Sequence, residues 1–259
     1  MQADSRKRSL DGLVALVTGA NGDIGSAVTR CLAAEGARVA VNDRVPGDDL
    51  NQLANEVGGM AAPADIRDPV AVASAVETVT ERLGPVDLLV ANAAHMTMAP
   101  LAEYDPGDWW QVIDTNLTGS FHCIQAVLPS MQVRGHGRVV VVTSEWGVIG
   151  WPNATAYSAS KGGLIGLTKS LGRELAPEGI IVNAVAPSVV DTVQLEVDAR
   201  DAGVSRAEIS ARYAERVPLG RLAAPEEVAA TIAFLADPRI VSLVGQIVSP
   251  NGGTTRARA

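Results

Sequence analysis

A serine, a tyrosine and a lysine lie within one short stretch near the middle of the chain, from Ser144 to Lys161. Tyr157 and Lys161 are four residues apart, so on a helix both side chains would leave the same face. A free phenol has a pKa of about 10, and a nearby cation lowers that pKa toward the range of a general acid or base at neutral pH. Ser144 could then hold a substrate oxygen. An ordinary amphipathic helix can carry the same spacing by chance, so the rest of the chain must decide.

Short apolar runs alternate with amphipathic segments from one end of the chain to the other. This alternation predicts an α/β fold, a doubly wound parallel sheet (Rossmann fold) of about seven strands with helices on both faces and ligands at the carboxyl ends of the strands. The expected strands cover residues 13–18, 38–42, 60–64, 86–91, 139–143, 180–186 and 245–249. One expected helix follows the glycines after residue 18. The other main expected helices cover 49–56, 69–83, 106–134, 156–176 and a segment from 225. No linker divides residues 10–259, which we interpret as one domain.

Three glycines, Gly19, Gly22 and Gly25, lie between the first expected strand and its helix. Glycines at this position allow the backbone to approach a pyrophosphate, and the helix N-terminus supplies N–H donors. Their spacing is not G-x-G-x-x-G, so the motif alone leaves a plain loop possible. Asp43 ends the second strand, where a carboxylate can accept the ribose hydroxyls of NAD and would repel the 2′-phosphate of NADP. Arg44 would partly offset that repulsion, so NAD is favoured and NADP is not excluded.

The composition is that of a globular protein, with 47% hydrophobic and 19% charged residues. A formal net charge of −8 argues against general affinity for nucleic acid or anionic membranes, since both would be repelled. Cys31 and Cys123 are the only cysteines and the three histidines are scattered, so we expect no disulfide framework and no metal site. The basic residues 1–9 lack a following apolar segment and predict a disordered tail. A cytoplasmic location fits best.

The chain resembles the short-chain dehydrogenase/reductase family, a group of NAD(P)-dependent oxidoreductases with a one-domain Rossmann fold. The resemblance runs from about Leu10 to Gly253. It depends on several motifs in the right order, which are Thr18-Gly-x-x-x-x-Ile-Gly25, Asp65, Asn92-Ala-Ala, Asn116, Ser144, Tyr157-x-x-x-Lys161, and Asn183-Ala-Val-Ala-Pro187 followed by Thr192. Each motif alone is weak, whereas the set is specific.

The resemblance implies a catalytic set of four residues. Tyr157 would be the general acid/base that exchanges a proton with the substrate oxygen, and Ser144 would hydrogen-bond the same oxygen. Lys161 would lower the pKa of Tyr157 and bind the nicotinamide ribose. Asn116 would hold a water that connects Lys161 to solvent.

The resemblance also implies a cofactor site. Asp65 and Ile66 would contact the adenine, Asn92 would steady the strand below the cofactor, and the backbone at Val190 with Thr192 would fix the carboxamide. Asp65 and Thr192 could instead simply cap helices. The complete expected set is Gly19, Asn21, Asp23, Ile24, Asp43, Asp65, Ile66, Asn92, Tyr157, Lys161, Pro187, Val190 and Thr192.

Three positions depart from the family pattern, because Asp23, Ala94 and Ser188 replace common glycines. A carboxylate at Asp23 would weaken pyrophosphate binding unless it turned away, and we expect it to cap the helix. None of the three departures removes a proton-handling group. They bear on affinity and pocket shape.

The substrate pocket is expected beyond this shared core, at His95, Met96, Glu145, Trp146 and Trp151 and in the segment 193–217. The two tryptophans favour an apolar or ring-shaped substrate, with core packing as the alternative. Glu145 would bind a polar substrate group or face solvent, and His95 is given no acid/base role. Residues 193–217, polar and helical in places, predict a mobile lid.

The leading hypothesis is an NAD(H)-dependent oxidoreductase that interconverts a secondary alcohol and a ketone. The alternative is an NADPH-dependent 3-oxoacyl-thioester (acyl-carrier-protein) reductase, against which Asp43 argues. A non-catalytic dinucleotide-binding protein would not need the proton-handling set. The family resemblance also implies a homotetramer in which the helices at 106–134 and 156–176 pair with their copies.

Overall fold

The computed structural model of the chain describes residues 9–255. The basic tail expected at the N-terminus therefore lies outside the described residues, except for Ser9. The hydroxyl of Ser9 donates a hydrogen bond of 2.9 Å to Glu35 Oε2. This contact anchors the beginning of the described chain.

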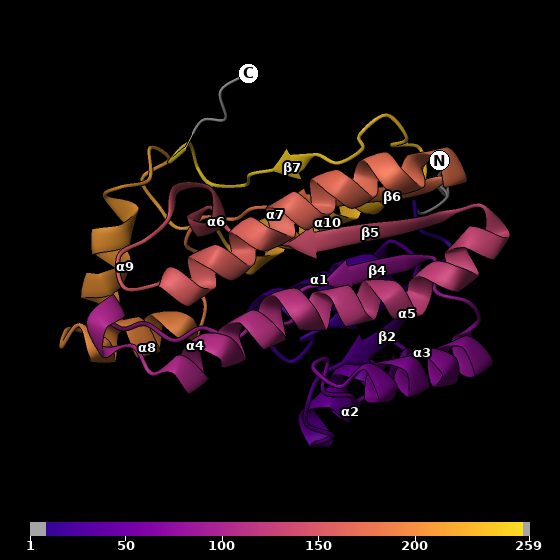
Figure 1. Cartoon of the computed structure of the whole chain (residues 1–259), viewed down its shortest axis with the longest axis horizontal. Coiled ribbons are helices and arrows are strands. Elements are labelled where there is room, and N and C mark those ends of the chain that lie inside the picture. Colours follow the sequence, from indigo (N-terminus) through magenta and orange to yellow (C-terminus); the bar gives the residue numbers. More distant parts are fainter. Residues whose placement is uncertain (1–8, 256–259) are drawn as a thin grey trace, which may run out of the picture.

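Seven parallel strands form one sheet in the order β3-β2-β1-β4-β5-β6-β7 (Figure 1). The strands are β1 Val14–Thr18, β2 Arg38–Asn42, β3 Met60–Ala61, β4 Leu88–Ala91, β5 Gly137–Val142, β6 Ile180–Val185 and β7 Ile247–Val248. The winding direction reverses between β1 and β4, and a crevice is expected where strand ends diverge at such a point. The predicted doubly wound α/β fold is confirmed.

Helices cover both faces of this sheet. The main helices are α1 Asp23–Ala34, α2 Asp48–Glu56, α3 Pro69–Leu83, α4 Pro106–Ile113, α5 Gly119–Arg134, α7 Thr155–Leu175 and α10 Pro225–Ala236. Side chains of α3, α5 and α7 join one hydrophobic core, and those of α1, α2 and α10 join the other. Figure 1 shows α3, α5 and α7 on the viewer's side of the sheet.

Local sequence explains where these elements begin. All five residues of β1 are buried, as a strand covered on both faces requires. Asp68 caps α3 by accepting hydrogen bonds from the amides of Val70 and Ala71, and Pro69 occupies the first turn, where no N–H is needed. Asp105 and Pro106 repeat this arrangement at α4.

The prediction of a single long helix over residues 106–134 is wrong. A π-helical turn at Asp114–Thr118 separates α4 from α5. The hydroxyl of Ser120 donates to the carbonyl of Asn116 at 2.7 Å at this turn. π-turns occur frequently at functional sites, and this one holds the predicted site residue Asn116.

The third strand covers only Met60–Ala61, whereas residues 60–64 were expected. Hydrogen bonds between the β2 backbone and this segment nevertheless continue on either side of Pro63, at Ala62 and Ala64. Further short elements complete the chain: the 3₁₀ turns Leu101–Glu103 and Ala176–Glu178, and α6 Trp146–Ile149. No helix of the described residues is long and apolar enough to cross a membrane.

The segment 193–217 contains two helices, α8 Gln194–Asp201 and α9 Arg206–Ala214. They share a small core of their own, formed by Leu195, Ala199, Ile209, Val217 and Leu222. This cluster is distinct from the two cores on the sheet. The expectation that the segment is helical in places is confirmed.

Candidate active site

Two adjoining cavities lie at the carboxyl ends of the strands. The inner cavity encloses about 250 Å³ and is lined by Ser144, Tyr157 and Lys161 among others. The outer cavity encloses about 450 Å³ and is lined by the glycine loop and by residues that follow β2 and β3. Six residues line both cavities, namely Ile24, Asn92, Ala94, His95, Thr192 and Gln194. The two cavities therefore form one continuous groove.

Ser144, Tyr157 and Lys161 lie together in the inner cavity. Tyr157 and Lys161 lie on the same face of α7, with Lys161 Nζ 5.5 Å from the centre of the Tyr157 ring. Ser144 follows β5 and hydrogen-bonds to Tyr157. Lys161 is buried, and its ammonium donates to the carbonyl oxygen of Val142 at 2.7 Å. The expected convergence of serine, phenol and ammonium is confirmed.

The pKa values of Tyr157 and Lys161 shift in opposite directions. Burial raises the pKa of Tyr157 to about 12, and the hydrogen bond with Ser144 opposes this rise. Burial lowers the pKa of Lys161 to about 7. The net shift of the Tyr157 pKa is upward because desolvation of the phenolate outweighs the other effects on it, and the expected lowering of this pKa by Lys161 stays a prediction. In this state Tyr157 carries its proton at neutral pH and is a proton donor.

Asn116 connects the segment after β4 to α7. Its Oδ1 accepts from the amide of His95 at 2.7 Å, and its Nδ2 donates to the His95 carbonyl and to Ser160 Oγ, both at 3.0 Å. Ser160 in turn donates to the carbonyl of Tyr157. Asn116 thus positions the backbone around the inner cavity, and its expected role in a water relay to Lys161 stays a prediction.

The glycines of the loop after β1 are required by close packing. Gly19 has a φ of +63°, and a Cβ there would lie 2.7 Å from Ala93 Cα. A Cβ at Gly25 would lie 2.1 Å from the carbonyl oxygen of Gly19. Gly22, by contrast, has only one neighbouring oxygen within 4 Å of such an atom. This turn lines the outer cavity, and no side chain caps the first turn of α1. An anionic group such as a pyrophosphate fits this geometry.

Asp23 does not cap α1, contrary to expectation. Gly22 occupies the N-cap position, and Asp23 Oδ2 instead accepts a hydrogen bond of 2.7 Å from the backbone amide of Val193. The carboxylate thus reaches across the groove to the start of the 193–217 segment. No sequence pattern predicts a contact between residues so far apart in the chain.

Asn92 holds the glycine loop in place. Its Nδ2 donates to the carbonyl oxygens of Thr18 and Gly19 at 2.9 and 3.1 Å. The side chain therefore ties the end of β4 to the end of β1, on both sides of the point where the winding reverses. This agrees with the steadying role that the sequence implied.

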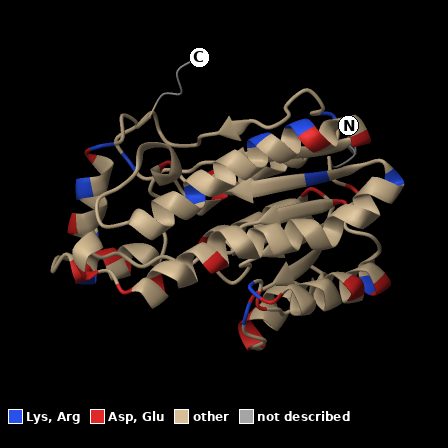
Figure 2. Cartoon of the chain, viewed as in Figure 1, with Lys and Arg blue, Asp and Glu red and all other residues tan. Residues whose placement is uncertain are grey.

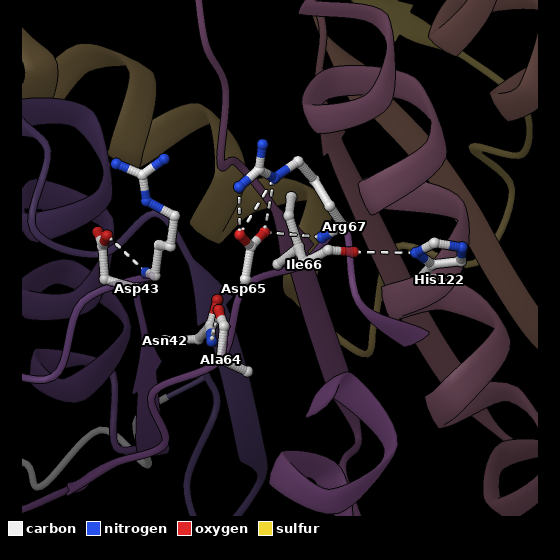
Figure 3. A network of polar contacts seen from close by, with 8 residues as sticks. Asn42, Asp43, Ala64, Asp65, Ile66, Arg67 and His122 are labelled. Atoms are coloured by element: carbon white, nitrogen blue, oxygen red, sulfur yellow. Dashed lines mark hydrogen bonds and ion pairs between the residues drawn. The ribbon is translucent and has the colours of Figure 1, made fainter. Parts of the chain in front are cut away.

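Asp43 lies at the end of β2, where it lines the outer cavity (Figure 3). Its carboxylate accepts hydrogen bonds from the backbone amides of Arg44 and Asn21, at 2.7 and 3.2 Å. Asn21 itself lines neither cavity, so it acts by orienting Asp43. Arg44 also lines the outer cavity, and no ion pair between residues 9 and 255 includes it.

Asp65 forms an ion pair with Arg67 across the outer cavity from Asp43 (Figure 3). The guanidinium of Arg67 donates to both carboxylate oxygens, with the shortest distance 2.6 Å, and it lowers the pKa of Asp65. The helix-cap alternative for Asp65 is wrong, because Asp68 caps α3. The carbonyl of Ile66 contacts His122 Nδ1 at 3.0 Å. Sequence reasoning missed Arg67, although its position two residues after Asp65 is a visible signal.

The segment after β6 forms another wall of the inner cavity. Pro187, Ser188, Val190 and Thr192 line it. Val190 forms a parallel bridge with Ala223, which fixes the course of this segment. Thr192 does not cap α8, since the N-cap position is Val193 and no side chain caps the helix.

The aromatic residues near Ser144 form a stack. Trp146 lines the inner cavity, and Trp151 lies parallel to it with ring centres 4.7 Å apart. Trp151 is not part of the cavity lining and carries Arg216 over its ring at 5.1 Å. His95 lines both cavities, and burial with the nearby Arg44 lowers its pKa, so it is neutral at pH 7.

Glu145 does not take either of the places expected for it. It is 4% exposed, so it does not face solvent, and it is not part of the inner cavity lining. The hydroxyl of Thr254 donates to Glu145 Oε1, and the Glu145 amide donates to the carbonyl of Pro187. Glu145 therefore joins the C-terminal segment to the backbone beside Ser144.

Three residues of α8 that were not singled out from the sequence also line the inner cavity, namely Gln194, Leu195 and Asp198. They belong to the segment expected to form a lid. Their spacing of one to four residues places them on one side of a helix, and that periodicity was the available signal. No cluster of metal-ligating residues occurs between residues 9 and 255.

Comparisons with known proteins agree with this geometry. A family model described as enoyl-(acyl carrier protein) reductase matches residues 19–255. The chain is 38% identical over 252 residues to the 3-oxoacyl-[acyl-carrier-protein] reductase FabG of Thermotoga maritima, covering 94% of this chain and 98% of the relative. It is 41% identical over 246 residues to the cis-4-hydroxycyclohexanecarboxylate dehydrogenase of Sinomonas cyclohexanicum, covering 93% and 96%.

Proposed function

The chain belongs to the short-chain dehydrogenase/reductase family and is an oxidoreductase of CH–OH and keto groups; from this premise we propose that it interconverts a secondary alcohol and a ketone with NAD(H). The observation that carries the proposal is the convergence of Ser144, Tyr157 and Lys161 in a cavity that continues into the groove beside the glycine loop. A protein that only bound a dinucleotide would not need this proton-handling set.

The residues of the outer cavity fit a nicotinamide dinucleotide. Gly22 leaves space, the first turn of α1 is uncapped, and Asn42 Oδ1 is buried without a hydrogen-bond partner in a residue that lines this cavity. Asp43 would hold ribose hydroxyls, the backbone around Ile66 would lie against the adenine, and Val190 with Thr192 would hold the carboxamide. When bound, the dinucleotide supplies the acceptor or donor of a hydride.

Each catalytic residue has a specific task in this proposal. Tyr157 donates its proton to the ketone oxygen in reduction and removes it from the alcohol in oxidation. Ser144 orients that oxygen by a hydrogen bond. Lys161 would hold the nicotinamide ribose and favour the phenolate form of Tyr157 when its ammonium is charged. Residues 193–217 would close over the groove and exclude water.

Asp43 favours NAD over NADP. Its carboxylate is held by two backbone amides at the end of β2, so it cannot easily turn away from a 2′-phosphate. Arg67 is already paired with Asp65, which leaves Arg44 as the cation that could offset the repulsion. The alternative, an NADPH-dependent 3-oxoacyl-thioester reductase, draws support from the name of the Thermotoga maritima relative and shares the same catalytic residues.

The family resemblance supports two further proposals, a homotetramer and a cytoplasmic location. The tetramer would pair α4, α5 and α7 with their copies. The cytoplasmic location is compatible with the two free cysteines, Cys31 and Cys123, and it stays a prediction.

The test is a panel of secondary alcohols and ketones followed by NADH absorbance, with NADPH in parallel. Replacing Tyr157 by Phe should reduce turnover by at least about a hundredfold, because it removes the phenol hydroxyl that donates the proton. NADH binding, measured by fluorescence, should change little. Tyr104→Phe is the matched control, because Tyr104 donates to the Thr97 carbonyl and lines neither cavity.

Normal turnover in Tyr157→Phe would contradict the proposed mechanism. A strong preference for NADPH would contradict the argument from Asp43 and favour the thioester reductase. In either case Asp43→Ala should shift the preference toward NADP, since it removes the repelling charge.

A further inference from the structure

A carboxylate of the 193–217 segment lines the inner cavity. Asp198 lies on α8, is half-buried, and forms part of the same wall as Gln194 and Leu195. The rest of this cavity contains the reacting side chains Ser144 and Tyr157. A substrate with its alcohol at Tyr157 would therefore share the cavity with a second polar group.

The Asp198 carboxylate is held in place from both sides. Gln194 Nε2 donates to Oδ1 at 3.0 Å, and the hydroxyl of Tyr213 donates to Oδ2 at 3.1 Å. Burial and the adjacent Asp198 charge raise the pKa of Tyr213 to about 12, so it remains a donor at neutral pH. Each carboxylate oxygen has two acceptor positions, and one on each is still available.

The Asp198 carboxylate has no ion-pair partner among the described residues. No Lys or Arg between residues 9 and 255 forms an ion pair with it. Arg216 lies over the ring of Trp151, outside the cavity lining. The ionisable side chains that line the cavity with Asp198 are His95, Tyr157 and Lys161. His95 is neutral, and the Lys161 ammonium donates to the Val142 carbonyl.

We propose that Asp198 is a specificity-determining residue, which accepts a hydrogen bond from a hydroxyl or ammonium group of the substrate and excludes substrates that carry a carboxylate. The substrate class is a diol or an amino alcohol with a small apolar body. Met96, Trp146 and Leu195 supply the apolar walls, and the cavity of about 250 Å³ limits the size. The inference rests on the proposed function, because it assumes that the alcohol reacts in this cavity.

This substrate class differs from that of a relative with similar sequence. The Sinomonas cyclohexanicum protein is named for a hydroxycyclohexane that carries a carboxylate. A second carboxylate close to Asp198 would be repelled, and this repulsion is stronger in a partly desolvated cavity, where Asp198 has no ion-pair partner. Asp198 should therefore separate the substrates of the two proteins.

The experiment compares three ring alcohols that differ at one position, namely cyclohexanol, 4-aminocyclohexanol and 4-hydroxycyclohexanecarboxylate. Both kcat/KM and binding are measured, the latter by quenching of tryptophan fluorescence, since Trp146 lines the cavity. The wild-type protein should favour the amine over the carboxylate by at least about tenfold. Asp198→Asn should reduce this ratio severalfold and should change kcat/KM for the amine and the carboxylate more than for cyclohexanol.

Two further variants separate recognition from structure. Tyr213→Phe removes one of the hydrogen bonds that orient Asp198 and should reduce the ratio by a smaller factor than Asp198→Asn. Asp201→Asn is the matched control, because Asp201 is exposed on the same helix and lines neither cavity. It should leave the ratio unchanged.

An equal preference for the amine and the carboxylate in the wild-type protein, or an unchanged ratio in Asp198→Asn, would overturn the inference. If any of these alcohols is still oxidised in that case, the proposed function stands without the inference about Asp198. A different result is that none of the alcohols is oxidised, while the wild-type protein binds the amine more tightly than the carboxylate and Asp198→Asn reduces this preference. Recognition by Asp198 is then supported and the proposed reaction fails.

Discussion

Lys161 is buried and Tyr157 is half-buried beside it, and desolvation favours the neutral form of each side chain. The phenol therefore keeps its proton at neutral pH, whereas burial lowers the pKa of the Lys161 amine to about 7. This pair is a poised proton donor whose charge state responds to small changes in its surroundings. Spacing in the sequence identifies the pair, whereas the pKa shifts depend on a degree of burial that the spacing does not reveal.

The pKa of Lys161 predicts a pH-dependent cost of folding. Its folded value of about 7 lies below the unfolded value of about 10.4, so between these values the unfolded chain binds more protons. Stability should therefore rise with pH across this window. Lys161→Met removes the cost of burying the amine, so this variant should be more stable than the wild type at pH 7. The gain should be at most about 1.4 kcal/mol for each unit by which the Lys161 pKa is lowered, and it should be smaller at pH 9.

Urea denaturation at pH 7 and pH 9 without cofactor measures this difference. Tyr157 stays largely protonated at both values, so it adds little to the change. Lys169→Met is the control, because Lys169 is exposed on the same helix. A stability difference between Lys161→Met and the wild type that is the same at both pH values would show that Lys161 is not desolvated as the structure indicates.

One hydrogen bond joins the N-terminus of α1 to the 193–217 segment. Asp23 Oδ2 accepts from the Val193 amide at 2.7 Å, just before α8 begins. The same carboxylate lines the outer cavity, where a pyrophosphate would lie. Asp23 therefore combines two opposing effects, since it anchors the proposed lid and repels an anionic ligand.

Two substitutions separate these effects. Asp23→Ala removes the acceptor, which contributes about 1 kcal/mol, and should increase hydrogen–deuterium exchange of residues 194–214 by about fivefold. Asp23→Asn keeps an acceptor and removes the charge, so exchange should stay near that of the wild type while NADH binds more tightly. If Asp23→Ala left the exchange of this segment unchanged, the hydrogen bond would not anchor it.

The elements were predictable to the extent that their signals are local. Buried parallel strands are continuous apolar runs, so all seven were found, although the third and the seventh cover only two residues each. Asn116 was expected inside one helix, because no sequence pattern marks the π-turn that holds it. The partners of Asp23 and Glu145 lie 170 and 109 residues away, so the fold alone brings them together.

In the whole chain, the charged residues are unevenly distributed along α5 and α7. Figure 2 shows that the central parts of these helices are largely free of charged residues, while Asp, Glu, Lys and Arg gather at their ends and on other elements. Phe121 on α5 and Trp110 on α4 are 45% and 58% exposed. An exposed apolar surface of this kind on a chain with a net charge of −8 is typical of a site of association.

The proposed homotetramer can be tested by its mass and by a substitution on α5. Light scattering after size exclusion should give about four times the chain mass of 26.8 kDa. Phe121→Glu should yield a smaller species, because pairing of α5 with its copy would bury a carboxylate without a partner. Val70→Glu is the control, because Val70 is 76% exposed on α3, away from the proposed interface, and Glu is favourable in the first turn of a helix. A tetramer that survives Phe121→Glu would place the interface on other elements, and a monomeric wild type would contradict the assembly altogether.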